Sequence, residues 1–189
     1  MDATCIGIDP GVSGAVSIIR PFGLPEIHKC PDSLQGMTEL LSKAVVLSVP
    51  EQIRITLEKV GSFGMEGRAT LATFMINFGQ WQGIIETNAI IDRVQWQLVT
   101  PQAWQKPYRE RLIAGPPKPK DAIKATMSRA EFAMEIKLWK SANEKAKRAR
   151  KKELMRIAEE NGAPLKPLNL ATADSYLIAL HGRNEIEWT

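Results

Sequence analysis

Cysteine is scarce in this sequence, and several features that define whole classes of protein are missing. Only Cys5 and Cys30 occur among 189 residues, and their spacing matches no zinc-binding pattern, so we expect reduced thiols in a cytoplasmic protein. No apolar stretch reaches the length of a membrane span, and the first residues carry no basic leader or signal-type apolar segment. No internal repeat is visible, which argues against a repeat architecture.

Charge is distributed unevenly along the chain. Residues 106–156 contain 16 Lys and Arg against 6 Asp and Glu, a net charge of +10, whereas the remainder contains 9 against 15, a net charge of −6. Such asymmetry indicates a polyanionic partner, most simply nucleic acid. A basic run is also typical of an ordinary solvated helix, so this signal needs a second one. The overall composition, with 44% apolar and 24% charged residues, predicts one globular domain over residues 1–189.

Hydrophobic periodicity predicts three consecutive strands, then strands that alternate with helices, then helices alone. This order implies an α/β fold with a mixed sheet and helices on its faces. Thr100 and Pro101 are typical of the N-cap and first position of a short helix, and the proline-rich stretch 114–120 predicts a break. The expected strands cover residues 4–9, 15–20, 26–30, 54–60 and 94–99, and the expected helices cover residues 36–47, 69–91, 101–104, 121–140, 141–161 and 171–181.

The helix expected over residues 69–91 carries an apolar stripe that glycines interrupt. Its members are Leu71, Phe74, Met75, Phe78, Ile84 and Ile85. We interpret the aromatic residues Phe74, Phe78 and Trp81 as packing residues, either of the core or of a dimer interface. Trp104 is expected to pack beneath the strand that it follows.

Three acidic residues stand where the expected fold could bring them together. Asp9 ends the first strand, Glu58 lies near the end of the fourth, and Asp174 lies in the first turn of the last helix. If the two strands are neighbours, all three can meet at one sheet edge. Clustered carboxylates repel one another, and a divalent cation such as Mg²⁺ relieves that repulsion. Each acid also has an ordinary interpretation, as a turn residue, a solvent-facing strand residue or a first-turn helix acid.

Five sequence blocks, taken in order, resemble a known family. They are GIDPGVSGAV (7–16), TLEKVGSF (56–63), FGQWQGII (78–85), VTPQAWQK (99–106) and ATADSYLIALHGR (171–183). Together they are similar to the RuvC-type Holliday junction resolvases of the RNase H-like superfamily, and most of all to the short phage-encoded versions. The resemblance leaves out the stretch 107–143.

The resemblance implies an RNase H-like mixed five-stranded sheet flanked by helices, with a helical insertion near 107–143 and a basic helix near 144–161. The family cleaves four-way DNA junctions as a homodimer and leaves 5′-phosphate and 3′-hydroxyl ends. It uses Mg²⁺ or Mn²⁺ held by acidic residues, and serves DNA recombination and repair. The FGQWQG block matches the family's dimer helix.

The resemblance also assigns roles to individual residues. Asp9, Glu58 and Asp174 match the family's metal-binding catalytic acids. Lys106, or Gln105 beside it, falls near a lysine that approaches the scissile phosphate, and Lys145 aligns loosely with a second one. Phe63 lies where relatives place an aromatic residue that enters the opened junction. Basic residues of the helix are expected to contact DNA: Lys145, Lys147, Arg148, Arg150, Lys151 and Lys152.

One departure concerns the metal site. Ala171 stands where bacterial members carry a further aspartate, and the nearest polar residue is Asn169. The site could use three acids completed by Asn169 or water, it could be weakened, or the position could have been neutralised on purpose. The alternatives to junction cleavage are therefore a flap or fork nuclease and a junction-binding protein. No second glycine-rich phosphate loop occurs, which disfavours a sugar kinase of related fold.

Overall fold

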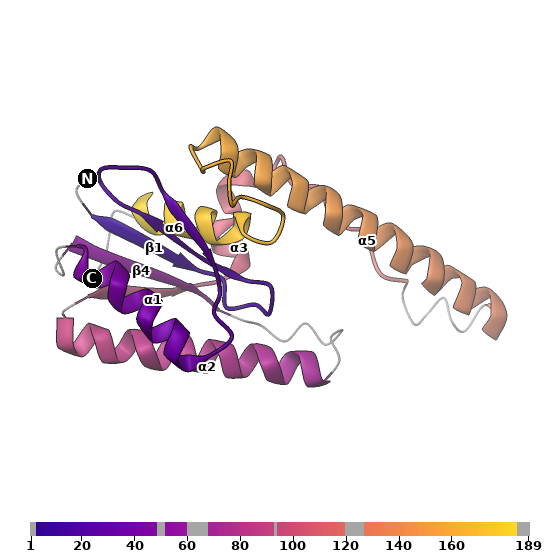
Figure 1. Cartoon of the computed structure of the whole chain (residues 1–189). Helices are drawn as coiled ribbons and strands as arrows, with labels where there is room; N and C mark the ends of the chain where they lie inside the picture. The colour runs from indigo at the N-terminus through magenta and orange to yellow at the C-terminus, as the bar shows by residue number, and fades with distance from the viewer. Residues whose placement is uncertain (1–2, 49–51, 60–67, 93, 120–126, 185–189) are drawn as a thin grey trace.

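A computed structural model describes residues 3–48, 52–59, 68–92, 94–119 and 127–184 (Figure 1). Phe63 lies outside the described residues. The strands are β1 (Thr4–Ile8), β2 (Ala15–Ile19), β3 (Glu26–Lys29), β4 (Ile53–Glu58) and β5 (Gln95–Val99). The helices are α1 (Leu34–Val46), α2 (Arg68–Asp92), α3 (Pro101–Trp104), the 3₁₀ helix η2 (Lys106–Tyr108), α5 (Arg129–Glu160) and α6 (Ala173–Asn184).

The strands form one mixed sheet in the order β3-β2-β1-β4-β5. The first three strands pair antiparallel, whereas β1–β4 and β4–β5 pair parallel, as the predicted mixed five-stranded sheet requires. Ile8 pairs with Leu57 at the carboxyl ends of β1 and β4. Asp9 and Glu58 therefore leave neighbouring strands at the same edge of the sheet.

Helices cover both faces of this sheet (Figure 1). On one face, α1 and α2 pack against apolar strand side chains such as Ile6 and Ile55, and Trp81 of α2 belongs to the same cluster. On the other face, α6 and the end of α5 pack with Trp104. The sheet therefore separates two apolar layers, and its carboxyl edge lies beside α3 and α5.

Helix α5 corrects the predicted pair of helices over 121–140 and 141–161. It is one helix that begins after Ser128, whose hydroxyl accepts from the Glu131 N–H while the Glu131 side chain accepts from the Ser128 N–H. Neither glycine nor proline interrupts residues 129–160, so nothing in the backbone chemistry ends the helix early. Other boundaries differ by a few residues: β4 ends at 58 rather than 60, α1 begins at 34 rather than 36, and α6 begins at 173 rather than 171.

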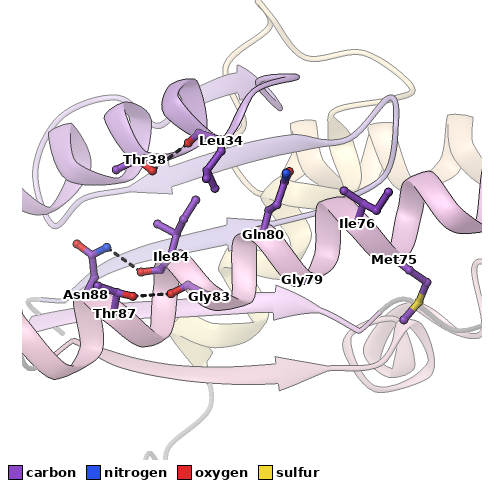
Figure 2. Close-up of a pocket in the computed structure, with 10 residues that line it drawn as sticks. All are labelled: Leu34, Thr38, Met75, Ile76, Gly79, Gln80, Gly83, Ile84, Thr87 and Asn88. Carbon is purple, nitrogen blue, oxygen red and sulfur yellow. Dashed lines mark hydrogen bonds between the residues drawn. The ribbon is translucent and has the colours of Figure 1, made fainter.

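The predicted apolar stripe of α2 is only partly a core stripe. Trp81, Ile84 and Ile85 are buried, but Met75 and Ile76 are 50% and 59% exposed. These exposed residues border an apolar groove of about 640 Å³ between α1 and α2, in which Gly79 and Gly83 leave the floor open (Figure 2). Of the two interpretations of this stripe, core or dimer interface, burial in the core therefore applies to its second half only.

No helix within the described ranges is long and apolar enough to cross a membrane.

Candidate active site

The loop after β1 is built around Asp9. The Gly11 N–H donates to Asp9 Oδ1 at 2.9 Å, and the Asp9 N–H donates to the Ala15 carbonyl at 3.0 Å. A Cβ at Gly14 would lie 2.0 Å from the Asp9 carbonyl oxygen, so only glycine allows this tight return into β2. The Cys30 thiol donates to the same carbonyl from the far side of β2 at 3.2 Å. These contacts fix the Asp9 carboxylate at the end of the strand.

Glu58, the last residue of β4, is held by a tryptophan. The Trp104 indole N–H donates to Glu58 Oε1 at 2.8 Å, and the Trp104 side chain is buried. Thr100 positions this tryptophan, because its hydroxyl caps α3 by accepting from the Ala103 N–H. The predicted cap is confirmed, as is the packing of Trp104 after β5. The bond to Glu58 was not predicted, because it joins positions far apart in the sequence.

Asp174 reaches the same edge from above, because α6 packs directly on β1. A Cβ at Gly7 would lie 2.3 Å from backbone atoms of Ser175 and Ala179, so helix and strand touch without an intervening side chain. The hydroxyls of Ser17 and Ser175 are 2.7 Å apart, which ties α6 to β2 as well. The first turn of α6, with Asp174, therefore lies over the ends of the central strands.

The three carboxyl groups perturb one another. Burial raises the pKa of Glu58 to about 8, and the charges of Asp9 and Asp174 add to that rise while the Trp104 N–H opposes it. Burial also raises the pKa of Asp174 to about 6, with the charge of Asp9 as the second cause. Burial raises the pKa of Asp9 above its usual value, although the hydrogen bond from the Gly11 N–H opposes this rise. Lys151 lowers the pKa of all three, so its charge reaches the whole cluster.

A cleft of about 760 Å³ opens beside these acids. Glu58 and Asp174 line it together with basic residues of α5, namely Lys147, Arg150 and Lys151. Gln105 also lines it and accepts a hydrogen bond from Arg150. The cleft thus combines carboxylates with a positively charged wall, which is the charge arrangement expected for phosphate recognition.

The donor chemistry of the cluster matches a hard divalent cation. Carboxylate oxygens are the ligands that Mg²⁺ prefers, and Asp174 Oδ1 is buried without a hydrogen-bond partner in the described part of the chain. However, no group of three His, Cys, Asp or Glu side chains among the described residues is arranged so as to hold a metal ion. The cluster therefore offers the type of donor atom that such a cation prefers, but its three acids are not positioned as one complete group of metal ligands.

Other residues singled out in the sequence lie elsewhere. Within the described ranges, Lys106, Lys145, Arg148 and Lys152 are exposed and are not among the residues that line the cleft. Their roles stay predictions.

Asn169, the polar residue nearest Ala171 in the sequence, is engaged in its own loop. Asn169 Oδ1 accepts from the Ala171 N–H at 2.8 Å, and its amide nitrogen donates to the Pro167 carbonyl at 3.2 Å. Asn169 is exposed and does not line the cleft. Its amide thus shapes the turn before α6, while Ala171 offers no polar side chain.

An ion-pair network that the sequence did not predict fixes α5 beside the site. Arg111 donates to Glu153 at 2.8 Å and to Glu160 at 2.7 Å, and Arg156 also contacts Glu153 at 3.0 Å. These pairs connect the segment after η2 with the last turns of α5. They hold the basic wall against the carboxyl edge of the sheet.

Comparison with solved structures gives the same architecture. RuvC of Thermus thermophilus in complex with a Holliday junction substrate is 14% identical, with a TM-score of 0.50 over 95% of this chain and 91% of that one. A further Thermus thermophilus RuvC structure is 13% identical, with a TM-score of 0.48 over 94% and 92% of the two chains. No protein-family model and no curated protein matches the sequence. The chain therefore has the α/β fold of RuvC, an RNase H-like fold.

Proposed function

We propose that this chain is a single-domain, divalent-metal-dependent DNA endonuclease that cleaves four-way junctions and leaves 5′-phosphate and 3′-hydroxyl ends. The observation that carries the proposal is the shared cleft, where Glu58 and Asp174 face Lys147, Arg150 and Lys151, close enough to Asp9 for its charge to raise the pKa of both acids. The RuvC-like fold supports it, since a solved RuvC of this fold is bound to a Holliday junction substrate. The finer similarity to phage-encoded versions stays a prediction.

Asp9, Glu58 and Asp174 would hold Mg²⁺ or Mn²⁺. The bound cation would supply Lewis-acid polarisation of the scissile phosphate. The chain's own residues do the rest: Trp104 orients Glu58, Gly11 orients Asp9, and the basic wall holds the phosphodiester against the acids. Lys151 offsets the negative charge that accumulates when phosphate enters.

The direct test is cleavage of labelled four-way junctions by wild type and Asp9→Asn. We expect Mg²⁺-dependent cleavage by the wild type, and a loss of at least a hundredfold in the variant with junction binding retained. Undiminished cleavage by Asp9→Asn would refute the assigned site. Flaps, forks and linear duplexes in the same panel decide whether the substrate is a four-way junction or another branch.

A junction-binding protein with a weakened metal site is the second candidate. Two observations favour it: the described acids do not form a three-member metal group, and Ala171 supplies no further carboxylate. If it is correct, the wild type binds junctions without cutting them, and Ala171→Asp gains Mg²⁺-dependent cleavage. Cleavage by the wild type excludes it.

The proposal includes a homodimer, because a four-way junction presents two equivalent strands for cleavage and a two-fold dimer presents two sites. The apolar groove between α1 and α2, with Met75 and Ile76 exposed on its rim, is the surface assigned to this contact.

A further inference from the structure

The basic residues of α5 do not all face the cleft. An α-helix turns by about 100° per residue, so Lys147 and Lys151 lie within about 40° of one another, and both line the cleft. Lys145, Arg148 and Lys152 lie about 100–160° away from Lys147 on the same helix and are exposed. The helix therefore has one basic face towards the acids and another directed away from them.

Further basic residues of α5 point in the same direction as Lys147 but lie beyond the cleft. Lys140 and Arg129 fall within about 20° of Lys147 around the helix axis, and both are exposed. We call Arg129, Lys140, Lys147 and Lys151 the α5 stripe. At about 1.5 Å per residue it extends for about 33 Å, which equals about ten base pairs of duplex DNA.

The first half of α5 projects from the body of the molecule and carries this stripe with it (Figure 1). All the buried residues of α5, namely Leu154, Ile157 and Ala158, lie in its last turns. The projecting part is braced by residues 113–119, which lie along it: the Trp139 indole N–H donates to the Pro116 carbonyl at 3.0 Å. A Cβ at Gly115 would lie 2.8 Å from Asn143 Oδ1, which shows how closely the two segments pack.

From this geometry we propose that the α5 stripe binds the phosphate backbone of one duplex arm as that arm leaves the cleft. The inference rests on the proposed function, because it takes the cleft as the place where the scissile phosphate sits. It gives a role to residues 107–119 and 127–143: the bracing segment and the projecting helix extend the phosphate track by Arg129 and Lys140. A solvated helix would need neither the brace nor the alignment with the cleft.

Arm length is the variable that tests this. Junction binding is measured in EDTA, so that no cleavage occurs, with arms of about 8 or about 25 base pairs capped by hairpins. We expect tighter binding and a steeper salt dependence for the long-armed junction, because an arm of about 8 base pairs spans about 27 Å and ends before Arg129, which lies about 33 Å along the helix from Lys151. In each subunit, Arg129→Ala/Lys140→Ala should lower the slope of log affinity against log salt by about two for long arms and by about one for short arms, because short arms still reach Lys140.

Controls separate the possible failures. The matched variant Lys29→Ala/Lys43→Ala removes two exposed charges on β3 and α1, and should keep the arm-length effect. The inference is overturned if Arg129→Ala/Lys140→Ala retains the effect, or if Lys145→Ala/Arg148→Ala removes it instead. If the wild type binds no junction at either arm length, the proposed function itself fails. Circular dichroism confirms that α5 is intact in each variant.

Discussion

At the scale of single residues, the contact between Trp104 and Glu58 is the most specific feature of the site. The Trp104 indole N–H donates to the Glu58 carboxylate at 2.8 Å in a buried setting. A hydrogen bond to a charged group stabilises a protein by about 1.5–3 kcal/mol. Trp104→Phe should therefore raise the pKa of Glu58 further and weaken Mn²⁺ binding about tenfold to a hundredfold at neutral pH. Isothermal titration calorimetry with Mn²⁺ measures the affinity. The pH dependence of cleavage should also shift to higher pH.

Trp81→Phe is the matched control for that prediction. It also removes a buried indole, but Trp81 lies on α2 in the apolar layer on the other face of the sheet from Trp104. Both variants lose packing, so equal weakening of Mn²⁺ binding by both would show that Trp104 acts only through the core.

The raised pKa of Glu58 also predicts how the free energy of unfolding of the metal-free protein depends on pH. The pKa of Glu58 rises from 4.5 to about 8 on folding, so the native state binds more protons than the unfolded chain between these values. The free energy of unfolding should therefore fall as pH rises through this range, by about 1.4 kcal/mol for each pH unit. Urea titrations of wild type and Glu58→Gln in EDTA check this. The variant should match wild type near pH 4 and be the more stable near pH 9; equal stability at both would contradict it.

At the scale of elements, the close packing of α6 on β1 places Asp174. Gly7→Ala introduces a Cβ only 2.3 Å from the α6 backbone, and backbone cannot yield as a flexible side chain does. We expect a loss of about 1–3 kcal/mol in stability and a loss of cleavage under conditions where the protein is still folded. Ser17→Ala is the control, because it removes the bond to Ser175 under the same helix without adding volume. It should lose only about 1 kcal/mol and keep cleavage.

The elements themselves could largely be predicted from the sequence, because strand alternation and helical periodicity are local. The five strands, the cap at Thr100 and the position of Asp9 and Glu58 at strand ends follow from such patterns. What could not be predicted depends on non-local contacts: the Trp104 bond to Glu58, the pairs of Arg111 with α5, and the exposure of Met75. Periodicity shows that a face is apolar, but not which partner covers it.

At the scale of the whole molecule, charge that is segregated along the sequence becomes segregated in space. Four of the Lys and Arg residues in 106–156 line the cleft that Glu58 and Asp174 also line, and others lie along a helix that projects from the body (Figure 1). Affinity for any DNA should therefore fall steeply with salt. Cleavage, in contrast, should depend on the carboxylates that the fold gathers from distant parts of the chain.

The assembly is tested at the same scale through the groove between α1 and α2. Met75 and Ile76 are half exposed on its rim, and water contact with such apolar surface is unfavourable unless a second subunit covers it (Figure 2). Met75→Asp/Ile76→Asp should give a monomer by sedimentation velocity without unfolding the chain. Paired cleavage of both strands of a junction should then be lost, while single nicks persist. Val46→Asp, at an apolar position that is 80% exposed outside the groove, should leave the dimer intact. A wild-type chain that sediments as a monomer together with junction DNA would exclude this interface.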